Sequence, residues 1–137
     1  MRSILVDTGA VFALLRPTDR HHAQAEAFFR SLHGTDRLFT TWPVVTECTF
    51  ALERNRDALF DWLLASGITV VDFALDDVAL MRAWASRYSD REVDFADATL
   101  VWLATRQRTN LIATTDFNDF EAYRLANRRT FRNLFAR

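Results

Sequence analysis

The chain has 137 residues, half of them hydrophobic and twelve of them Phe, and its formal net charge is −1. This length and composition suit one globular domain with one sizeable core, and they exclude an intrinsically disordered chain. Because the net charge is near zero, the field of the whole chain gives no sign of nucleic-acid binding, and such binding would depend on local charge.

The absence of Lys and the single Cys exclude several kinds of catalytic and metal site. All seventeen basic residues are Arg, which excludes a Schiff-base lysine and a P-loop lysine. Cys48 is the single cysteine, so one chain forms no disulfide or cysteine metal cluster, and a small buried side chain is expected there. The apolar start of the chain is too short for a signal peptide, and no apolar run is long enough for a membrane span. We therefore expect a soluble, cytoplasmic protein.

Short apolar runs alternate with helical patterns along the chain. In chain order we expect a strand at 4–6, helices at 10–15 and 21–33, a strand at 38–40, helices at 43–54 and 56–65, a strand at 68–71, helices at 76–88 and 95–108, a strand at 111–113 and, within a mixed tail at 123–137, a last strand near 131–135. This alternation predicts a single α/β domain over 1–137, with a parallel sheet covered by helices on both faces. In such sheets, sites form at the carboxyl ends of the strands, where the chain order reverses.

Four acids stand out because of where they fall in this pattern. Asp7 and Asp116 directly follow apolar strands, although Asp is also common in turns. Glu47 and Asp97 fall among apolar neighbours on expected helices, where a solvated acid is unusual. The alternative interpretation of Asp97 is that it simply complements the helix dipole from the first helical turn. Asp94 fits a helix N-cap first and a metal ligand second.

Together, the four acids predict a metal site. Carboxylates gathered at one sheet edge repel one another, and a buried carboxylate without a partner is strongly destabilising. A divalent cation removes that repulsion, and ligation by oxygen atoms alone suits Mg²⁺ or Mn²⁺. Such ions polarise a phosphoryl oxygen and lower the pKa of bound water. We therefore expect metal-assisted hydrolysis of a phosphodiester.

Four segments in order carry a resemblance to a known family. They are ILVDTGA (4–10), TE (46–47), DFADA (94–98) and ATTDFNDF (113–120). The set resembles the ordered motifs of PIN-domain proteins, most closely the VapC-type toxins of bacterial toxin–antitoxin pairs, and it spans essentially the whole chain. The resemblance implies a three-layer α/β/α sandwich and an endoribonuclease that depends on Mg²⁺ or Mn²⁺.

The resemblance also implies roles for single residues. By position, the catalytic and metal-binding acids are Asp7, Glu47, Asp97 and Asp116, and the supporting residues are Thr8, Thr114, Asp94 and Asp119. Two positions depart from the family pattern. Gly9 stands where Ser is more usual, which removes one polar contact near the metal. Phe117 and Asn118 stand where basic residues are common, which weakens one expected contact with RNA.

Contacts with RNA phosphates must come from Arg in this chain. The candidates are Arg16, Arg20, Arg124, Arg128, Arg129 and Arg132, and a solvated surface is an equal alternative for them. Trp42 and Phe117 offer rings for base stacking, although core packing is the preferred interpretation of both. The resemblance implies two protein partners, namely a second copy that gives a homodimer and a cognate antitoxin. The expected helices at 23–32 and 51–64 supply apolar surface for a groove.

Two rival interpretations use the same residues. A phosphatase with Asp7 as nucleophile would need an acid two residues later and a Lys further on, but position 9 is Gly and the chain has no Lys. A non-catalytic or RNA-processing PIN-like module, which binds RNA or a protein partner, is the alternative to the toxin. The four intact acids argue against it.

Overall fold

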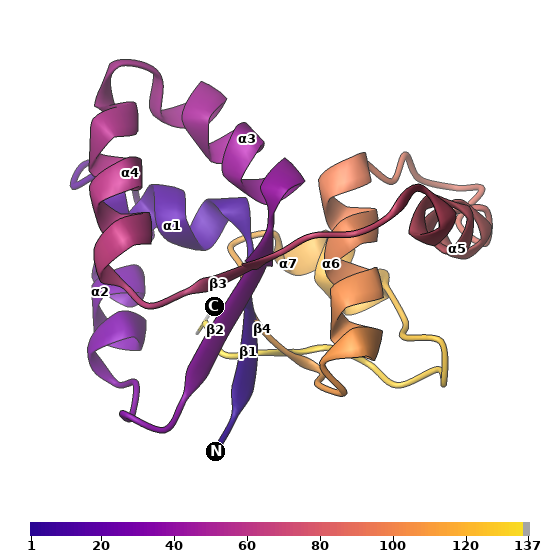
Figure 1. Cartoon of the computed structure of the whole chain (residues 1–137). Helices are drawn as coiled ribbons and strands as arrows, with labels where there is room; N and C mark the ends of the chain where they lie inside the picture. The colour runs from indigo at the N-terminus through magenta and orange to yellow at the C-terminus, as the bar shows by residue number, and fades with distance from the viewer. Residues whose placement is uncertain (136–137) are drawn as a thin grey trace.

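A central sheet of five parallel strands organises the chain (Figure 1). The computed structural model describes residues 1–135. The strands are β1 (Ser3–Val6), β2 (Arg37–Thr41), β3 (Thr69–Val71), β4 (Leu111–Ala113) and β5 (Arg132–Asn133). Their order in the sheet is β3-β2-β1-β4-β5, and every pairing is parallel. The predicted parallel sheet is confirmed.

Helices connect the strands and cover both faces of the sheet. They are α1 (Thr8–Leu15), α2 (His22–Arg30), α3 (Trp42–Leu52), α4 (Arg56–Ala65), α5 (Leu75–Ala85), α6 (Phe95–Arg106) and α7 (Phe117–Ala122), with a short 3₁₀ turn, η1, at Glu53–Asn55. Figure 1 shows α1, α2 and α4 on one side of the sheet and α5 and α6 on the other. This is the α/β/α sandwich that the sequence predicts. None of the helices within residues 1–135 is long and apolar enough to cross a membrane.

Each face of the sheet has its own hydrophobic core. Successive side chains of a strand point to opposite faces, so Leu5 belongs to one core cluster while Ile4 and Val6 belong to the other. All three side chains of this central strand are fully buried. Cys48 is buried in the second cluster, as its apolar surroundings in the sequence predict. The strand therefore forms a fixed base for the residues that follow it.

Several element boundaries differ from the sequence predictions. The helix expected at 21–33 ends at Arg30, and Ser31 Oγ donates a hydrogen bond to the carbonyl of Phe28 there. Helix α7 is an addition, because a six-residue helix is too short to show an apolar period. The last strand, expected near 131–135, is reduced to Arg132 and Asn133. Residues 136 and 137 of the predicted tail lie outside the described residues.

The strand order places a switch point between β1 and β4. From the central β1, the chain builds β2 and β3 on one side and β4 and β5 on the other. Val6 pairs in register with Ala113, so the residues that follow these two strands leave the sheet side by side. Those residues begin with Asp7 and Thr114, and this edge is where parallel sheets form their sites.

Candidate metal centre

Asp7 is fixed at the carboxyl end of β1 by hydrogen bonds on both of its carboxylate oxygens. It is the N-cap of α1, where Oδ1 accepts from the backbone N–H of Thr8 at 2.7 Å. Oδ2 accepts from Thr114 Oγ1 at 2.7 Å. The residue is only 5% exposed. Burial raises the pKa of Asp7 to about 6, although these two hydrogen bonds act to lower it.

Thr114 links the two acids that follow neighbouring strands. Its buried hydroxyl donates to Asp7 and accepts from the backbone N–H of Asp116 at 2.9 Å. The side chain of Asn133, on β5, donates to the carbonyl of Thr114 at 2.9 Å and accepts from its N–H at 3.2 Å. The two-residue strand β5 therefore holds the segment that carries the site. Asn133 gave no signal in the sequence.

Asp97 projects from the first turn of α6 and is 4% exposed. Its Oδ2 accepts a hydrogen bond from the phenol of Tyr123 at 2.8 Å. Burial, together with the charges of Asp7 and Asp94, raises the pKa of Asp97 to about 8. Asp94 accepts from the backbone N–H of Asp97 at 2.8 Å and is the N-cap of α6, which is the structure that its spacing predicts.

Glu47 reaches the same edge from α3. Its Oε1 accepts a hydrogen bond from Thr8 Oγ1 at 2.9 Å, so Thr8 connects it to the start of α1 next to Asp7. Burial and the charge of Asp94 raise the pKa of Glu47, while the bond from Thr8 lowers it. Thr8 also donates its backbone N–H to Asp7, so one residue bonds both acids.

Asp116 and Asp119 add two acids from α7. Asp116 is the N-cap of this helix, and its Oδ1 accepts from the backbone N–H of Asp119 at 3.2 Å. Burial and the neighbouring Asp119 carboxyl raise the pKa of Asp116. Asp119 also accepts a hydrogen bond from Arg91 Nη1 at 2.7 Å. Arg91, which the sequence did not single out, is the one Arg that forms an ion pair with these acids in the described part of the chain.

Three of these carboxylates form a compact group that fits a divalent cation. Asp97, Asp116 and Asp119 each offer one oxygen, and these oxygens lie within 4.8 Å of one another. Opposite ligands of an octahedral Mg²⁺ lie about 4.2 Å apart, so small side-chain rotations suffice to reach this geometry. The donor set consists of carboxylate oxygens, which Mg²⁺ and Mn²⁺ prefer. Burial and neighbouring negative charge raise the pKa of Asp97 and of Asp116, and a bound cation would offset both effects.

The structure therefore brings the four predicted acids to one sheet edge. It differs from the sequence prediction in which acids lie closest together. Asp119, expected only to support the site, lies in the compact group, whereas Glu47 and Asp7 flank it. The roles of all of them in catalysis and metal binding stay predictions. Tyr123 is the main contact that sequence reasoning missed, because nothing in its local sequence connects it with Asp97.

The departure at Gly9 has a structural counterpart. A Cβ at position 9 would overlap Thr115 Oγ1 and would lie 3.2 Å from Thr115 Cβ. The Thr115 hydroxyl therefore occupies the space that a Ser side chain at position 9 would need. Thr115, which follows β4, thus places a hydroxyl where a Ser at position 9 would have placed one.

The predicted RNA-contacting arginines fall in two separate parts of the chain, because Arg16 and Arg20 follow α1 whereas Arg124, Arg128, Arg129 and Arg132 follow α7. The Arg16 guanidinium packs over the ring of Phe12, and Arg20 donates to His21 Nε2 at 3.2 Å. Arg124 Nη1 donates to the carbonyls of Glu121, Ala122 and Tyr123 at the end of α7, while Arg128, Arg129 and Arg132 are exposed. The core-packing interpretation is wrong for Trp42, which is 51% exposed, and holds for Phe117, which packs on a core cluster.

Comparisons with known proteins agree with this architecture. A family model described as PIN domain matches residues 4–125. The structure is similar to VapC20 of Mycobacterium tuberculosis, described as a sarcin–ricin loop cleaving toxin, with a TM-score of 0.75 and 23% identity over 84% of this chain and 91% of that chain. It is also similar to FitAcB from Neisseria gonorrhoeae, with a TM-score of 0.57 and 22% identity over 85% of this chain and 90% of that chain. No curated protein matched the sequence.

Proposed function

The chain belongs to the PIN domain family, and from this premise we propose that it is a metal-dependent endoribonuclease. In this proposal it hydrolyses RNA phosphodiester bonds in the cytoplasm as the toxin of a toxin–antitoxin pair. The observation that carries the proposal is the group of three carboxylate oxygens within 4.8 Å at the switch point of the sheet. The structural similarity to VapC20, which is described as cleaving the sarcin–ricin loop, supports RNA as the substrate class.

We assign the binding of Mg²⁺ or Mn²⁺ to Asp97, Asp116 and Asp119, with Asp7 and Glu47 beside them. The ion would polarise a phosphoryl oxygen and lower the pKa of a water molecule. The chain's own residues provide orientation. Thr114 fixes Asp7 relative to the backbone of Asp116, and Tyr123 fixes Asp97, so the ligands are positioned before substrate arrives. Glu47, oriented by Thr8, would accept a hydrogen bond from water at the edge of the site.

A loss of activity in a single carboxylate variant tests this proposal. RNA is incubated with the protein and Mg²⁺ or Mn²⁺, and the cleaved ends are mapped. Asp97→Asn is expected to abolish cleavage, as is EDTA, whereas the control Asp61→Asn changes an exposed acid on α4 and leaves cleavage intact. Cleavage that survives Asp97→Asn or EDTA would contradict the metal mechanism. Tight RNA binding without cleavage under any metal would favour the non-catalytic module.

Exposed apolar side chains support an inhibitory protein partner. Phe50 on α3 and Phe60 and Leu64 on α4 are 77%, 43% and 88% exposed, which is unusual for such large side chains. The α2 residues expected to share this groove, Ala25 and Phe28, are buried in the core. We therefore propose that a cognate antitoxin covers α4 and the end of α3. Phe60→Asp with Leu64→Asp is expected to prevent inhibition while leaving RNA cleavage unchanged.

A homodimer is the second proposed assembly. Leu75 and Phe95, at the starts of α5 and α6, are exposed and offer apolar surface on the other side of the sheet from α4. Light scattering on the purified protein measures the mass directly. A monomer at all concentrations would contradict this part of the proposal and would leave the nuclease assignment unaffected.

A further inference from the structure

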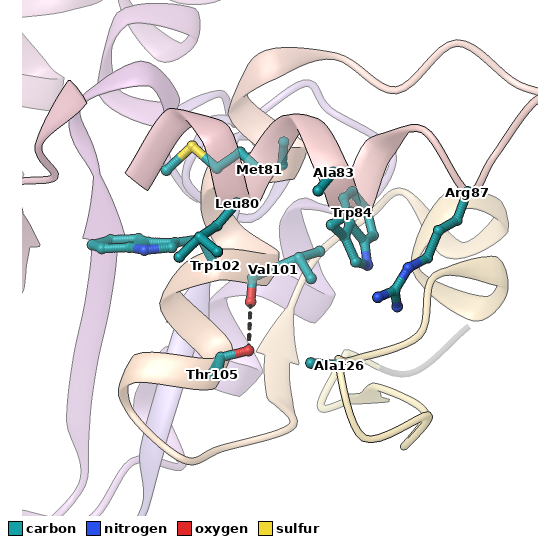
Figure 2. A pocket seen from close by; sticks show the side chains of 10 residues that line it. Leu80, Met81, Ala83, Trp84, Arg87, Val101, Trp102, Thr105 and Ala126 are labelled. Atoms are coloured by element: carbon teal, nitrogen blue, oxygen red, sulfur yellow. Dashed lines mark hydrogen bonds between the residues drawn. The ribbon is translucent and has the colours of Figure 1, made fainter. Parts of the chain in front are cut away.

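Three adjoining hollows share Ala126, and among residues 1–135 Arg is the only charged residue type that lines them. The first has a volume of about 220 Å³ and lies between α5 and α6, and Figure 2 shows Arg87 at its edge, close to Ala126. The second is lined by Arg108 and Arg129, and the third, of about 590 Å³, by Arg87, Arg124 and Arg128. We call these five residues the arginine surface.

The positive charge of the arginine surface is unpaired. All five residues are exposed, and within residues 1–135 none of them forms an ion pair with a carboxylate. The whole chain has seventeen Arg and a net charge of −1, so five Arg around hollows without any acid are a local concentration. Such a surface attracts a polyanion.

The backbone conformation of two residues of the arginine surface gives independent evidence that their side chains have a function. Arg108 and Arg128 have φ values of 51° and 65°, in the left-handed region that favours Gly. Arg108 lies just after the end of α6, where Gly is the common choice. Arg128 lies in the tight turn in which its N–H donates to the carbonyl of Leu125 at 2.9 Å. An Arg at two positions that would fold better with Gly points to a requirement for the side chain.

The arginine surface begins close to the metal centre. Tyr88 lines the third hollow, and its ring centroid lies 5.5 Å from that of Tyr123, whose phenol binds Asp97. Helix α6 connects the two regions along its length, since Asp97 lies in its first turn and Arg108 follows its last. Its twelve residues span about 18 Å.

We propose that the arginine surface binds the sugar–phosphate backbone of the RNA on one side of the cleaved bond and holds the strand without taking part in cleavage. This inference rests on the proposed ribonuclease function. A stacked strand rises about 3.4 Å per nucleotide along its axis, so the 18 Å length of α6 corresponds to roughly five nucleotides. An RNA is favoured over an acidic protein because the hollow that Arg87, Arg124 and Arg128 line also includes Tyr88, which packs on the Tyr123 that binds Asp97.

The test compares long and short substrates. An RNA that the protein cleaves is prepared with ten nucleotides on each side of the cut and, separately, with two. The triple variant Arg87→Gln/Arg108→Gly/Arg128→Gly is expected to raise KM for the long RNA about 10-fold or more with kcat unchanged, and to leave the short RNA unaffected. The plot of log Kobs against log salt concentration is expected to become less steep by about 2, because each of the three lost phosphate contacts contributes about 0.7 to the slope. The control is Arg37→Gln, an exposed Arg at the start of β2.

The two Gly substitutions protect the test against misfolding. They relieve the positive φ values, so the Tm of the variant is expected to be at or above that of the wild type, and lost binding then reflects lost charge. An unchanged KM for the long RNA would overturn the inference, while loss of cleavage in Asp97→Asn would still support the nuclease. Unchanged RNA affinity with weakened binding of poly-glutamate would also overturn it, in favour of an acidic protein. If the wild type cut no RNA, the proposed function would fail, and anisotropy with uncut RNA would still measure the arginine surface.

Discussion

Tyr123 and Asp97 form a buried pair in which the phenol donates to Oδ2 at 2.8 Å. The hydrogen bond lowers the pKa of Asp97 against the larger effects of burial and neighbouring negative charge. Its geometry fixes one oxygen of a carboxylate that belongs to the three-acid group. Tyr123 is therefore a positioning residue for the carboxylate group, although it comes from a segment far along the chain.

Tyr123→Phe is expected to weaken metal binding about 10-fold and to destabilise the fold by about 1 kcal/mol. The variant keeps the ring packing but leaves Asp97 Oδ2 without its donor, and lost partners of metal ligands typically weaken affinity to this extent. Titration calorimetry with Mn²⁺ measures the change. The control is Tyr88→Phe, which removes a phenol that accepts from the backbone of Arg124 and touches no acid of the site. Equal losses in both variants would contradict the positioning role.

Stability without metal is expected to fall as the pH rises from about 4 to about 8. The pKa of Asp97 is raised from 3.8 to about 8 and that of Asp7 from 3.8 to about 6, so the folded state binds more protons than the unfolded state in this range. The stabilising contribution is complete below pH 4 and is lost through pH 6 and pH 8. Thermal unfolding in EDTA at pH 5.5 and pH 8.5 measures the difference, which Asp97→Asn should reduce.

Added Mn²⁺ is expected to reverse this trend. A cation binds the ionised acids, so its stabilising effect should be larger at pH 8.5 than at pH 5.5 and its binding should release protons. Calorimetry in buffers of different ionisation enthalpy counts those protons. A Tm increase by Mn²⁺ that is the same at both pH values would contradict the assignment of the raised pKa values to the ligands.

The sequence predicted the place of the site because that place follows from strand geometry. Asp7 and Asp116 come after apolar strands, and the carboxyl ends of parallel neighbours share one edge. Glu47 and Asp97 were recognisable because their helix neighbours are apolar, and the structure confirms that Asp97 is buried. These inferences need only local periodicity and the rule that buried acids have partners.

The contacts that tune the site were not predictable in this way. Arg91 meets Asp119 from the segment between α5 and α6, and Tyr123 meets Asp97 from the end of α7. Both pairs depend on how irregular segments pack on the sheet, which leaves no period in the sequence. The sequence assigns Asp119 only a supporting role, because α7, which brings its carboxylate near that of Asp97, is too short to be recognised.

Thr114→Val is expected to destabilise the protein by about 1–3 kcal/mol and to weaken Mn²⁺ binding. The substitution keeps the volume but removes the hydroxyl that donates to Asp7 and accepts from the N–H of Asp116, so two buried groups lose a partner. Urea unfolding and Mn²⁺ titration give the two changes. The control is Thr99→Val, which removes a buried hydroxyl that bonds Thr41 and the carbonyl of Ala96. Loss of metal binding in that control as well would point to a general loss of folding.

Gly9 and Thr115 are expected to be coupled. Ala has a higher helix propensity than Gly by about 1 kcal/mol, so Gly9→Ala in α1 would ordinarily stabilise the protein. Here the new Cβ overlaps Thr115 Oγ1, and the Thr side chain must rotate, so the single variant is expected to be no more stable than the wild type. In the background Thr115→Ala the overlap is removed, and the same change should then stabilise by up to about 1 kcal/mol. Urea unfolding of the four proteins in this cycle measures the coupling. Equal effects of Gly9→Ala in both backgrounds would show that the Thr115 hydroxyl does not determine the residue at position 9.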